Sequence, residues 1–464
     1  MRRLAIALGA LLAGCSLQPE YQRPEMDLPQ EWKEVAPPQS YPGAEDGRWW
    51  RVFQDPSLEA TVEEALAGNA DLLVAAARVD EARALLGEAN SFFWPRVDAV
   101  AGASRQEVST RTATFFPGIP REYNNHRATL NVSYELDLFG RLRSSAAAAR
   151  AELEASEASR EAVRLALAAQ VAKSYFALLS LDEQVLLTRR TVASREESLA
   201  LQRRRLQGGV ISEFDLRQLE AEAAVVRAQL PPLERERERE EVALSVLLGR
   251  SPKQIFESQV NLKQTFDERP GAPAVPSGLP SELLLRRPDL VEAERQLIAA
   301  NARIGVARAE MFPSISLTGF FVSESAALSN LFAGGAAATW QIAAGITQPI
   351  FTGGRLRART EAAEARERAA LALYQQAIRA AFGEVRTALI AQSRARESYD
   401  AESARAAALE ETLRLARLRY QNGVASQLDV LDAERGLLAA QIARVEALRA
   451  HRAAVADLFR ALGG

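Results

Sequence analysis

The side chains whose ordinary pKa best suits nucleophilic or acid–base chemistry near neutral pH are one thiol and two imidazoles. Cys15 is the only cysteine among the 464 residues, and His126 and His451 are the only histidines. Neither histidine has a second metal ligand or a base at a recognisable spacing. The sequence also lacks a glycine-rich phosphate loop and a serine elbow. It therefore predicts no catalytic residue, no metal site and no non-covalent cofactor.

Cys15 stands where a lipoprotein signal places the residue that becomes acylated. Residues 2–3 are arginine, an apolar run covers residues 4–12, and Ala-Gly precedes the cysteine. A basic start, a short apolar core and small residues before the cut are typical of a secretory signal. We expect residues 1–14 to be removed and Cys15 to carry N-palmitoyl and S-diacylglycerol groups, which anchor a protein without spanning the bilayer. Ser16 follows, with no aspartate to indicate inner-membrane retention, so the outer membrane is predicted. The alternative is a buried structural cysteine.

Composition excludes a nucleic-acid partner. Fifty-seven basic and sixty acidic residues give a net charge of −3, so the chain has no excess of positive charge with which to bind nucleic acid. With 48% hydrophobic residues and many alanines, arginines and glutamates, the chain fits long ordered helices. After Cys15 we find no 20-residue apolar segment, so no membrane-spanning helix is expected.

The chain contains an internal repeat with an offset of about 214 residues. Residues 205–216 read RLQGGVISEFDL, and residues 419–430 read RYQNGVASQLDV. FGRLR at 139–143 matches GGRLR at 353–357, at nearly the same offset. A fixed offset of this kind indicates a duplicated supersecondary unit.

Each repeat contains long helical segments. Residues 141–207 hold no proline, and their apolar residues follow a coiled-coil spacing at Leu167, Val171, Leu178, Leu181, Val185 and Val192. A continuous helix of this length spans roughly 100 Å. Its counterpart covers 355–420, returning helices cover 214–248 and 428–462, and shorter helices at 57–90 and 288–310 open the repeats. Pro231-Pro232 is expected to bend or break the first returning helix.

The other segments alternate between apolar and polar residues. Residues 127–138 keep a strict period of two, and residues 340–347 repeat the pattern, so both predict strands with one apolar face. Partner strands begin after Pro95 and Pro313. Such strands fit an outer-membrane barrel or a soluble sandwich; the lipoprotein signal and the long helices favour the barrel. Four strands cannot close a barrel, so several copies of the chain must share one and enclose a passage.

Four further motifs resemble the TolC-type outer membrane factors, and the OprM/NodT lipoprotein branch most of all. They are ELDLFGRLR at 135–143, LRRPD at 285–289, MFPSISLTG at 311–319 and QPIF at 348–351. The resemblance runs in order from Cys15 to the end of the chain. It implies an all-α coiled-coil helical barrel joined to a transmembrane β-barrel, with four strands and two repeats from each chain of a homotrimer, and a long periplasmic extension.

The resemblance also implies domain boundaries. Residues 1–14 are the signal, 15–90 an N-terminal equatorial segment with the first helix, 91–140 the first two barrel strands, 141–250 the first long hairpin, 251–286 an equatorial insert, 287–312 the second short helix, 313–352 the last two strands, and 353–464 the second long hairpin with the C-terminal equatorial part.

The function implied is that of a passive outer-membrane exit duct. An inner-membrane RND-type pump would supply the energy and a periplasmic adaptor would clasp the helical tips, so that drugs or other small molecules leave the cell. The alternatives are a duct for type I protein secretion or for metal efflux, and a structural periplasmic coiled-coil lipoprotein. The structural alternative predicts one hairpin between compact β-modules instead of two hairpins with membrane-type strands.

By the same resemblance, Asp432, Asp429 and Tyr420 form the periplasmic gate. Carboxylates gathered at a pore tip repel one another and attract cations. The repeat separates the two aspartates: Asp429 aligns with Asp215, so it is expected to cap a helix in both repeats. Asp432 aligns with the neutral Gln218, which makes Asp432 the first choice for the ring. The family often has an arginine at the position of Ala425, so that part of the lock is missing.

The adaptor is expected to contact the hairpin bends, at Gly208, Gly209 and Val210 and at Asn422, Gly423 and Val424. The plainer interpretation is that glycine and asparagine are what a helix C-cap and a tight turn require. Both interpretations can hold, because the turn would itself be the docked surface. Trp94 and Trp340 fit interfacial aromatics or ordinary sheet packing.

Overall fold

The computed structural model describes residues 17–29, 47–111, 118, 120–257, 260 and 286–464. The predicted signal, the acylation residue Cys15 and most of the 251–286 insert lie outside the described residues. The chain forms two compact units. The first contains Met1–Glu25, Arg78–Glu157 and Glu292–Gln375, and the second contains Met26–Ala77, Ala158–Val291 and Gln376–Gly464.

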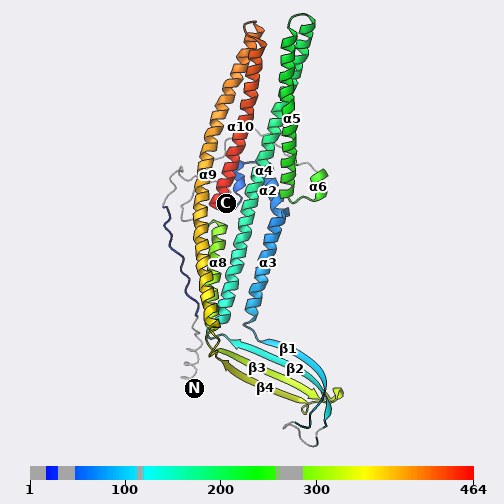
Figure 1. Cartoon of the computed structure of the whole chain (residues 1–464), viewed down its shortest axis with the longest axis vertical. Helices are drawn as coiled ribbons and strands as arrows, with labels where there is room; N and C mark the ends of the chain where they lie inside the picture. Colours follow the sequence, from blue (N-terminus) through cyan, green and yellow to red (C-terminus); the bar gives the residue numbers. More distant parts are fainter. Residues whose placement is uncertain (1–16, 30–46, 112–117, 119, 258–259, 261–285) are drawn as a thin grey trace. The chain divides into compact units, whose positions relative to one another are not determined.

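Helices dominate the chain, and one group of strands interrupts each repeat (Figure 1). The elements, in order, are η1 (Trp49–Phe53), α2 (Pro56–Gly68), α3 (Ala70–Ser91), β1 (Arg96–Glu107), β2 (Glu122–Leu136), α4 (Arg141–Gln207), α5 (Glu213–Leu247), α6 (Pro252–Glu257), α8 (Pro288–Ala309), β3 (Ser314–Ser325), η3 (Leu328–Asn330), β4 (Ala338–Thr347), α9 (Arg355–Gln421) and α10 (Gln427–Leu462). The two longest helices, α4 and α9, each have 67 residues, as the proline-free segments predict.

The helix expected over residues 57–90 is two helices, α2 and α3, with Asn69 between them. Asn69 leaves the helical conformation at ψ 131°, and its side-chain oxygen accepts from the backbone N–H of Asp71 at 2.9 Å. Its side-chain nitrogen donates to the Leu247 carbonyl at 2.9 Å. A single asparagine therefore starts α3 and ties it to the end of α5, a contact that helical periodicity cannot reveal.

Pro231 and Pro232 do not break α5, which continues as one helix through both. Each proline removes one backbone donor, and the rest of the 35-residue helix keeps its own bonds and its packing. The expectation was a bend or a break, and the break does not occur.

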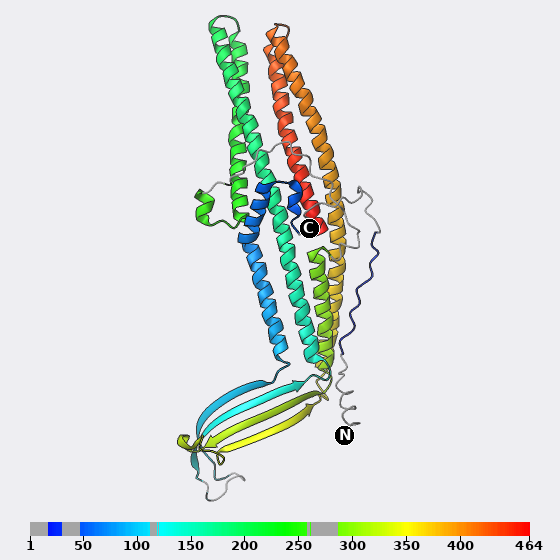
Figure 2. The same cartoon turned by 180° about the vertical axis from the view of Figure 1, so that it is seen from behind.

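The four strands form one antiparallel sheet in the order β1-β2-β3-β4, coloured cyan to yellow in Figure 2. Directly paired residues share a face of a sheet. The pairs Leu130↔Phe321 and Phe321↔Trp340 therefore form an apolar row, and Ser133↔Thr318 belongs to a polar row on the opposite face. This confirms the predicted alternation. Trp340 is 71% exposed on the apolar face.

The core of the second unit joins the N-terminal turn η1 to α4 and α10. Trp49 stacks on Phe459 at 5.3 Å between ring centroids, and Phe53 meets Phe176 edge to face at 4.8 Å. Among the described residues, α4 is long and apolar enough to cross a membrane, by length and composition only. In its most apolar stretch 56% of the residues are buried, because that part of α4 supplies core residues such as Val171 and Leu178.

In the first unit, the N-terminal segment from residue 17 runs antiparallel along α8. A Cβ added to Gly305 would lie 2.8 Å from the Cβ of Gln18, so the two backbones approach closely. Further along, Asn301 donates to the Pro19 carbonyl at 2.8 Å. Arg23 then forms a bidentate pair with Glu294, both bonds at 2.6 Å. This strap, residues 17–23, is held along its length.

Candidate functional site at the hairpin ends

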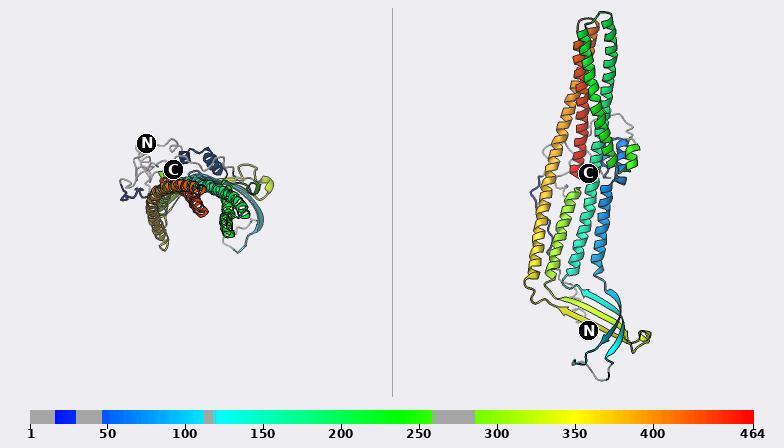
Figure 3. Two further views of the ribbon diagram at one scale, coloured as in Figure 1. Left: turned by 90° about the horizontal axis from the view of Figure 1, so that it is seen from above. Right: turned by 45° about the vertical axis from the view of Figure 1, so that its right-hand side comes forward.

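The second unit carries the ends of two hairpins, α4–α5 and α9–α10, which lie side by side (Figure 3). At the first bend, the N–H of Val210 bonds to the carbonyl of Arg205 at 2.8 Å, and that of Gly209 bonds to the carbonyl of Leu206 at 2.8 Å. This pair of bonds is a Schellman motif, which requires a left-handed residue. Gly209 supplies it at φ 71°.

The second bend contains the same Schellman motif. The N–H of Val424 bonds to the carbonyl of Arg419 at 2.9 Å, and Gly423 has φ 74°. Asn422 adds a bond from its side-chain nitrogen to the Leu418 carbonyl at 2.7 Å. The turn interpretation of these residues is thereby confirmed, and their docking role stays a prediction.

Asp429 caps α10 and Asp215 caps α5, as the repeat predicts. In α10, the Ser426 N–H donates to Asp429 at 2.7 Å, and the Asp429 N–H donates to the Ser426 hydroxyl at 3.3 Å. The corresponding distances between Ser212 and Asp215 are 3.1 and 3.2 Å. The hydrogen bonds from Ser426 hold the pKa of Asp429 below its ordinary value.

Asp432 has no capping role. Its carboxylate is 57% exposed and accepts from Arg435, one turn further along α10, at 2.7 Å. At the aligned position of the first hairpin the chain has Gln218. Asp432 is therefore an exposed, hairpin-specific carboxylate with a single exposed cation beside it.

Tyr420 joins the two hairpins. Its hydroxyl accepts from Arg205 Nη1 at 2.7 Å and from Gln202 Nε2 at 3.3 Å, and both donors lie on α4. The prediction named Tyr420 but not its partner. Arg205 and Tyr420 are 215 positions apart, and no local pattern links them.

The two hairpins are joined by a second contact, which the sequence analysis did not predict. Arg195 of α4 is 4% exposed, and its Nε lies 3.3 Å from Oε2 of Glu434 on α10. Arg195 Nη2 donates to the Leu431 carbonyl at 3.3 Å. Glu434 also pairs with Arg417 of α9 at 2.9 Å. The side chain of Leu431 packs into an apolar cluster with Leu199, Leu216 and Leu219 of the first hairpin.

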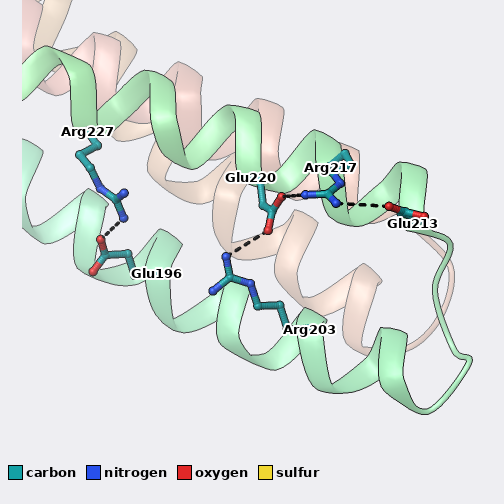
Figure 4. Close-up of polar contacts among 6 residues, drawn as sticks. All are labelled: Glu196, Arg203, Glu213, Arg217, Glu220 and Arg227. Carbon is teal, nitrogen blue, oxygen red and sulfur yellow. Dashed lines mark hydrogen bonds and ion pairs between the residues drawn. The ribbon is translucent and has the colours of Figure 1, made fainter.

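The first hairpin carries exposed ion pairs between its own helices (Figure 4). Glu220 of α5 pairs with Arg203 of α4 at 3.0 Å and with Arg217 at 2.9 Å. Arg227 pairs with Glu196 in the same way. Exposed pairs of this kind contribute little each, so they align α4 with α5 more than they stabilise the fold.

Apolar side chains project at both bends. Val210 is 64% exposed and Val424 is 63% exposed. Phe214, in the first turn of α5, is 75% exposed and was not singled out by the sequence. Exposed apolar residues at a helix end are candidates for a protein contact.

Neither histidine belongs to a bend. His126 is in β2, paired with Ala103 and Ser325. His451 is buried in α10. In the described parts of the chain, no group of three or more potential metal ligands occurs.

Comparison with known proteins gives the family. The sequence profile described as "Outer membrane efflux protein" matches residues 61–250 and 279–464. The toluene efflux pump outer membrane protein TtgC of Pseudomonas putida is 37% identical over 469 residues, covering 99% of this chain and 95% of that protein. The probable outer membrane lipoprotein SilC of Salmonella typhimurium is 34% identical over 473 residues, covering 100% and 98%.

Solved structures agree with the sequence matches. The CmeC outer membrane channel of Campylobacter jejuni superposes with a TM-score of 0.87 at 29% identity, covering 97% of this chain and 95% of that one. The fold expected from the resemblance, long helices with a four-stranded sheet, is the fold of these channels. The chain belongs to the outer membrane efflux protein family.

Proposed function

We propose that three copies of this chain form the exit duct of a tripartite efflux system, with four strands from each copy closing one membrane barrel. The observation that carries the proposal is the sheet. One face is apolar and exposed, and within the described chain β1 pairs only with β2 and β4 only with β3. In a bilayer, unpaired strand edges are too costly to persist, so the outer edges must pair between copies.

The N-terminal strap supports a lipid anchor beside the barrel. Gln18 lies against Gly305, near the end of α8 from which the chain enters β3. Cys15 lies three positions before Gln18, a distance of at most about 11 Å along the chain. Acyl groups on Cys15 would therefore enter the leaflet at the end of the sheet where α8 leads into β3, which fits the N-palmitoyl and S-diacylglycerol groups proposed for Cys15.

We assign the duct a passive role, with drugs or other small molecules as its cargo. A relative at 37% identity is described as part of a toluene efflux pump, and one at 34% identity as a cation efflux system protein. In our proposal an inner-membrane pump supplies the energy, and a periplasmic adaptor binds the bends at Gly208–Val210 and Asn422–Val424. Asp432 is the main gate carboxylate, with Asp429 and Tyr420 shaping the same tip. The protein conducts its cargo and performs no catalysis.

Cross-linking between strand edges tests the shared barrel. Val100 in β1 and Thr339 in β4 lie in one row of the sheet, three strand spacings or about 14 Å apart. A disulfide needs Cα atoms within about 7 Å, so a bond between Val100→Cys and Thr339→Cys forms only between chains. The β4 cysteine is moved in two-residue steps, because the register between chains is not fixed beforehand.

The proposal predicts covalent trimers in outer membranes at one register. Cysteines in the inner strands, at Thr129 of β2 and Val322 of β3, are the matched control and should give no bond between chains. Monomers at every register, in protein that has reached the membrane, would contradict a shared barrel.

A further inference from the structure

Both long helices begin with the same three residues, Arg-Leu-Arg, shortly after the chain leaves the sheet. A cation at a helix N-terminus is unfavourable because the helix dipole makes that end positive, whereas an anion there is favourable. Neither α4 nor α9, both described in full, has an acidic residue in its first turn. Each helix start therefore favours an anion that comes from outside the helix.

In the first repeat, the end of β2 and the loop after it supply two carboxylates. Asp137 accepts from the backbone N–H of Leu142 at 3.1 Å and from that of Arg143 at 2.8 Å. Glu135 forms a bidentate pair with Arg141, with bonds of 2.9 and 2.7 Å. The start of α4 is thus capped and neutralised by its own chain.

The second repeat keeps the arginines and lacks both carboxylates. At the offset of the repeat, Pro349 stands in place of Glu135, and Phe351 stands in place of Asp137. Ile350 and Phe351 are 90% and 89% exposed. Exposed apolar side chains therefore precede α9 where an acidic segment precedes α4.

The start of α9 is left without an anion of its own. In the part of the chain that the structure describes, the side chain of Arg355 has no hydrogen-bond or ion-pair partner, and the backbone N–H groups of Leu356 and Arg357 have no acceptor. The side chain of Arg357 pairs with Glu361 of its own helix at 2.9 Å, where both are exposed. The positions that bind Asp137 in the first repeat are therefore open in the second.

Arg355 lines a cavity of about 340 Å³ at the junction between the strands and the helices. The rings of Phe139 and Phe312, stacked at 5.0 Å between centroids, form part of its wall, as does Thr347 at the end of β4. The other two arginines that line this cavity are each bonded to a glutamate. Among the described residues of the wall, Arg355 is therefore the arginine whose charge is not neutralised.

We propose that the start of α9 binds the phosphate of a membrane phospholipid, in the place that the Asp137 carboxylate fills at the start of α4. The first repeat shows that these backbone positions hold an anion, and arginine and N–H donors suit a phosphate as well as a carboxylate. The acyl chains would lie against Ile350 and Phe351, which favours a lipid over a free phosphate. The site rests on the barrel proposed above, because that barrel brings the end of β4 to one leaflet of the membrane.

Phe351→Asp tests the site because it restores the carboxylate of the first repeat. That carboxylate should cap α9 as Asp137 caps α4, so it should displace the phospholipid without lowering the thermal midpoint of the protein. Ile350→Asp is the matched control: it adds the same charge at an equally exposed position whose counterpart is the apolar Leu136. Arg355→Gln removes the cation and should weaken binding about tenfold, the scale of one hydrogen bond to a charged group.

Native mass spectrometry of the full lipoprotein, in a detergent without phosphate, counts copies of the chain and bound lipids separately. Dioleoyl phosphatidylglycerol is the probe. Dioleoyl glycerol, which lacks the phosphate, and inorganic phosphate are the comparisons, and neither should compete at the same concentration. We expect wild type and Ile350→Asp to hold one phosphatidylglycerol per chain and Phe351→Asp to hold none. A monomeric mass would contradict the shared barrel, and the lipid count per chain would still decide the site.

Three results would overturn the phospholipid site. Equal lipid counts in wild type, Phe351→Asp and Arg355→Gln would show that the phosphate does not bind at this helix start. Inorganic phosphate that displaces the lipid at the same concentration would assign the site to a free anion. A wild type without lipid, together with loss of the trimer in Arg355→Gln, would assign Arg355 to an acidic residue of the next copy.

Discussion

At the residue scale, two aspartates three positions apart do different work. Asp429 accepts from Ser426 and holds the start of α10, and its pKa is lowered by those bonds. Among the described residues, Asp432 pairs with Arg435 on the exposed surface. The fold therefore uses Asp429 to start α10, whereas the carboxylate of Asp432 pairs with Arg435 one turn along the exposed face of the same helix.

This difference predicts which aspartate sets ion selectivity. Asp432→Asn removes the hairpin-specific carboxylate, so cation selectivity, measured as the reversal potential in a salt gradient, should fall. Asp429→Asn keeps an oxygen that can accept from Ser426, and it is the matched control with a smaller effect. Equal selectivity of Asp432→Asn and wild type would move the gate away from Asp432.

The sequence predicted contacts within each hairpin but not the contacts that join the two hairpins. Repeat alignment predicted that Asp215 and Asp429 cap their helices, because a cap is local and leaves a mark at fixed spacing. Arg205 with Tyr420, and Arg195 with Glu434, are brought together only by packing of the hairpins. Nothing in either local sequence specifies such a partner.

At the element scale, the two bends are copies in geometry as well as in sequence. Both end a long helix with a Schellman motif and start the next with a capping box. The strands were predicted by their period of two, and the long helices by their composition. The break at Asn69 and the continuity of α5 through Pro231 were not predicted, since both depend on tertiary contacts and on the length of helix around them.

The first bend offers a test that isolates its backbone conformation. Gly209→Ala forces a side chain into the left-handed region and should destabilise the bend by about 1–2 kcal/mol. Gly208→Ala is the control: its Cβ would meet only ordinary contacts at 3.6 Å or more. In Gly209→Ala alone, hydrogen exchange at the bend should become faster and binding to the adaptor should weaken. Equal binding by both variants would contradict a docked surface made by the turn.

The sheet offers a test with neighbouring residues on opposite faces. Ile342 belongs to the row of Gly319 on the apolar face, and Gln341 pairs with Phe320 on the other face. Ile342→Arg should destabilise the barrel in lipid by roughly 2–4 kcal/mol if that position lies near the midplane. Gln341→Arg faces the passage and should be tolerated. Urea titration in vesicles compares the two, and equal losses would argue against a lipid-facing apolar side.

At the scale of the whole molecule, one chain does not form a closed β-barrel by itself. Its sheet has two open edges, and its exposed apolar face suits lipid better than water. The sequence predicted that several copies share a barrel, because four strands cannot close one. The copy number came only from the family resemblance, since no residue pattern within one chain counts its neighbours.

The most direct test of the shared duct is single-channel recording from mixed oligomers of wild-type and Asp432→Asn chains. Three chains around one passage should give four classes of channel, with none, one, two or three variant chains, and cation selectivity should decrease stepwise. Only the two parental classes, at any mixing ratio, would show that each chain conducts alone and would contradict the account.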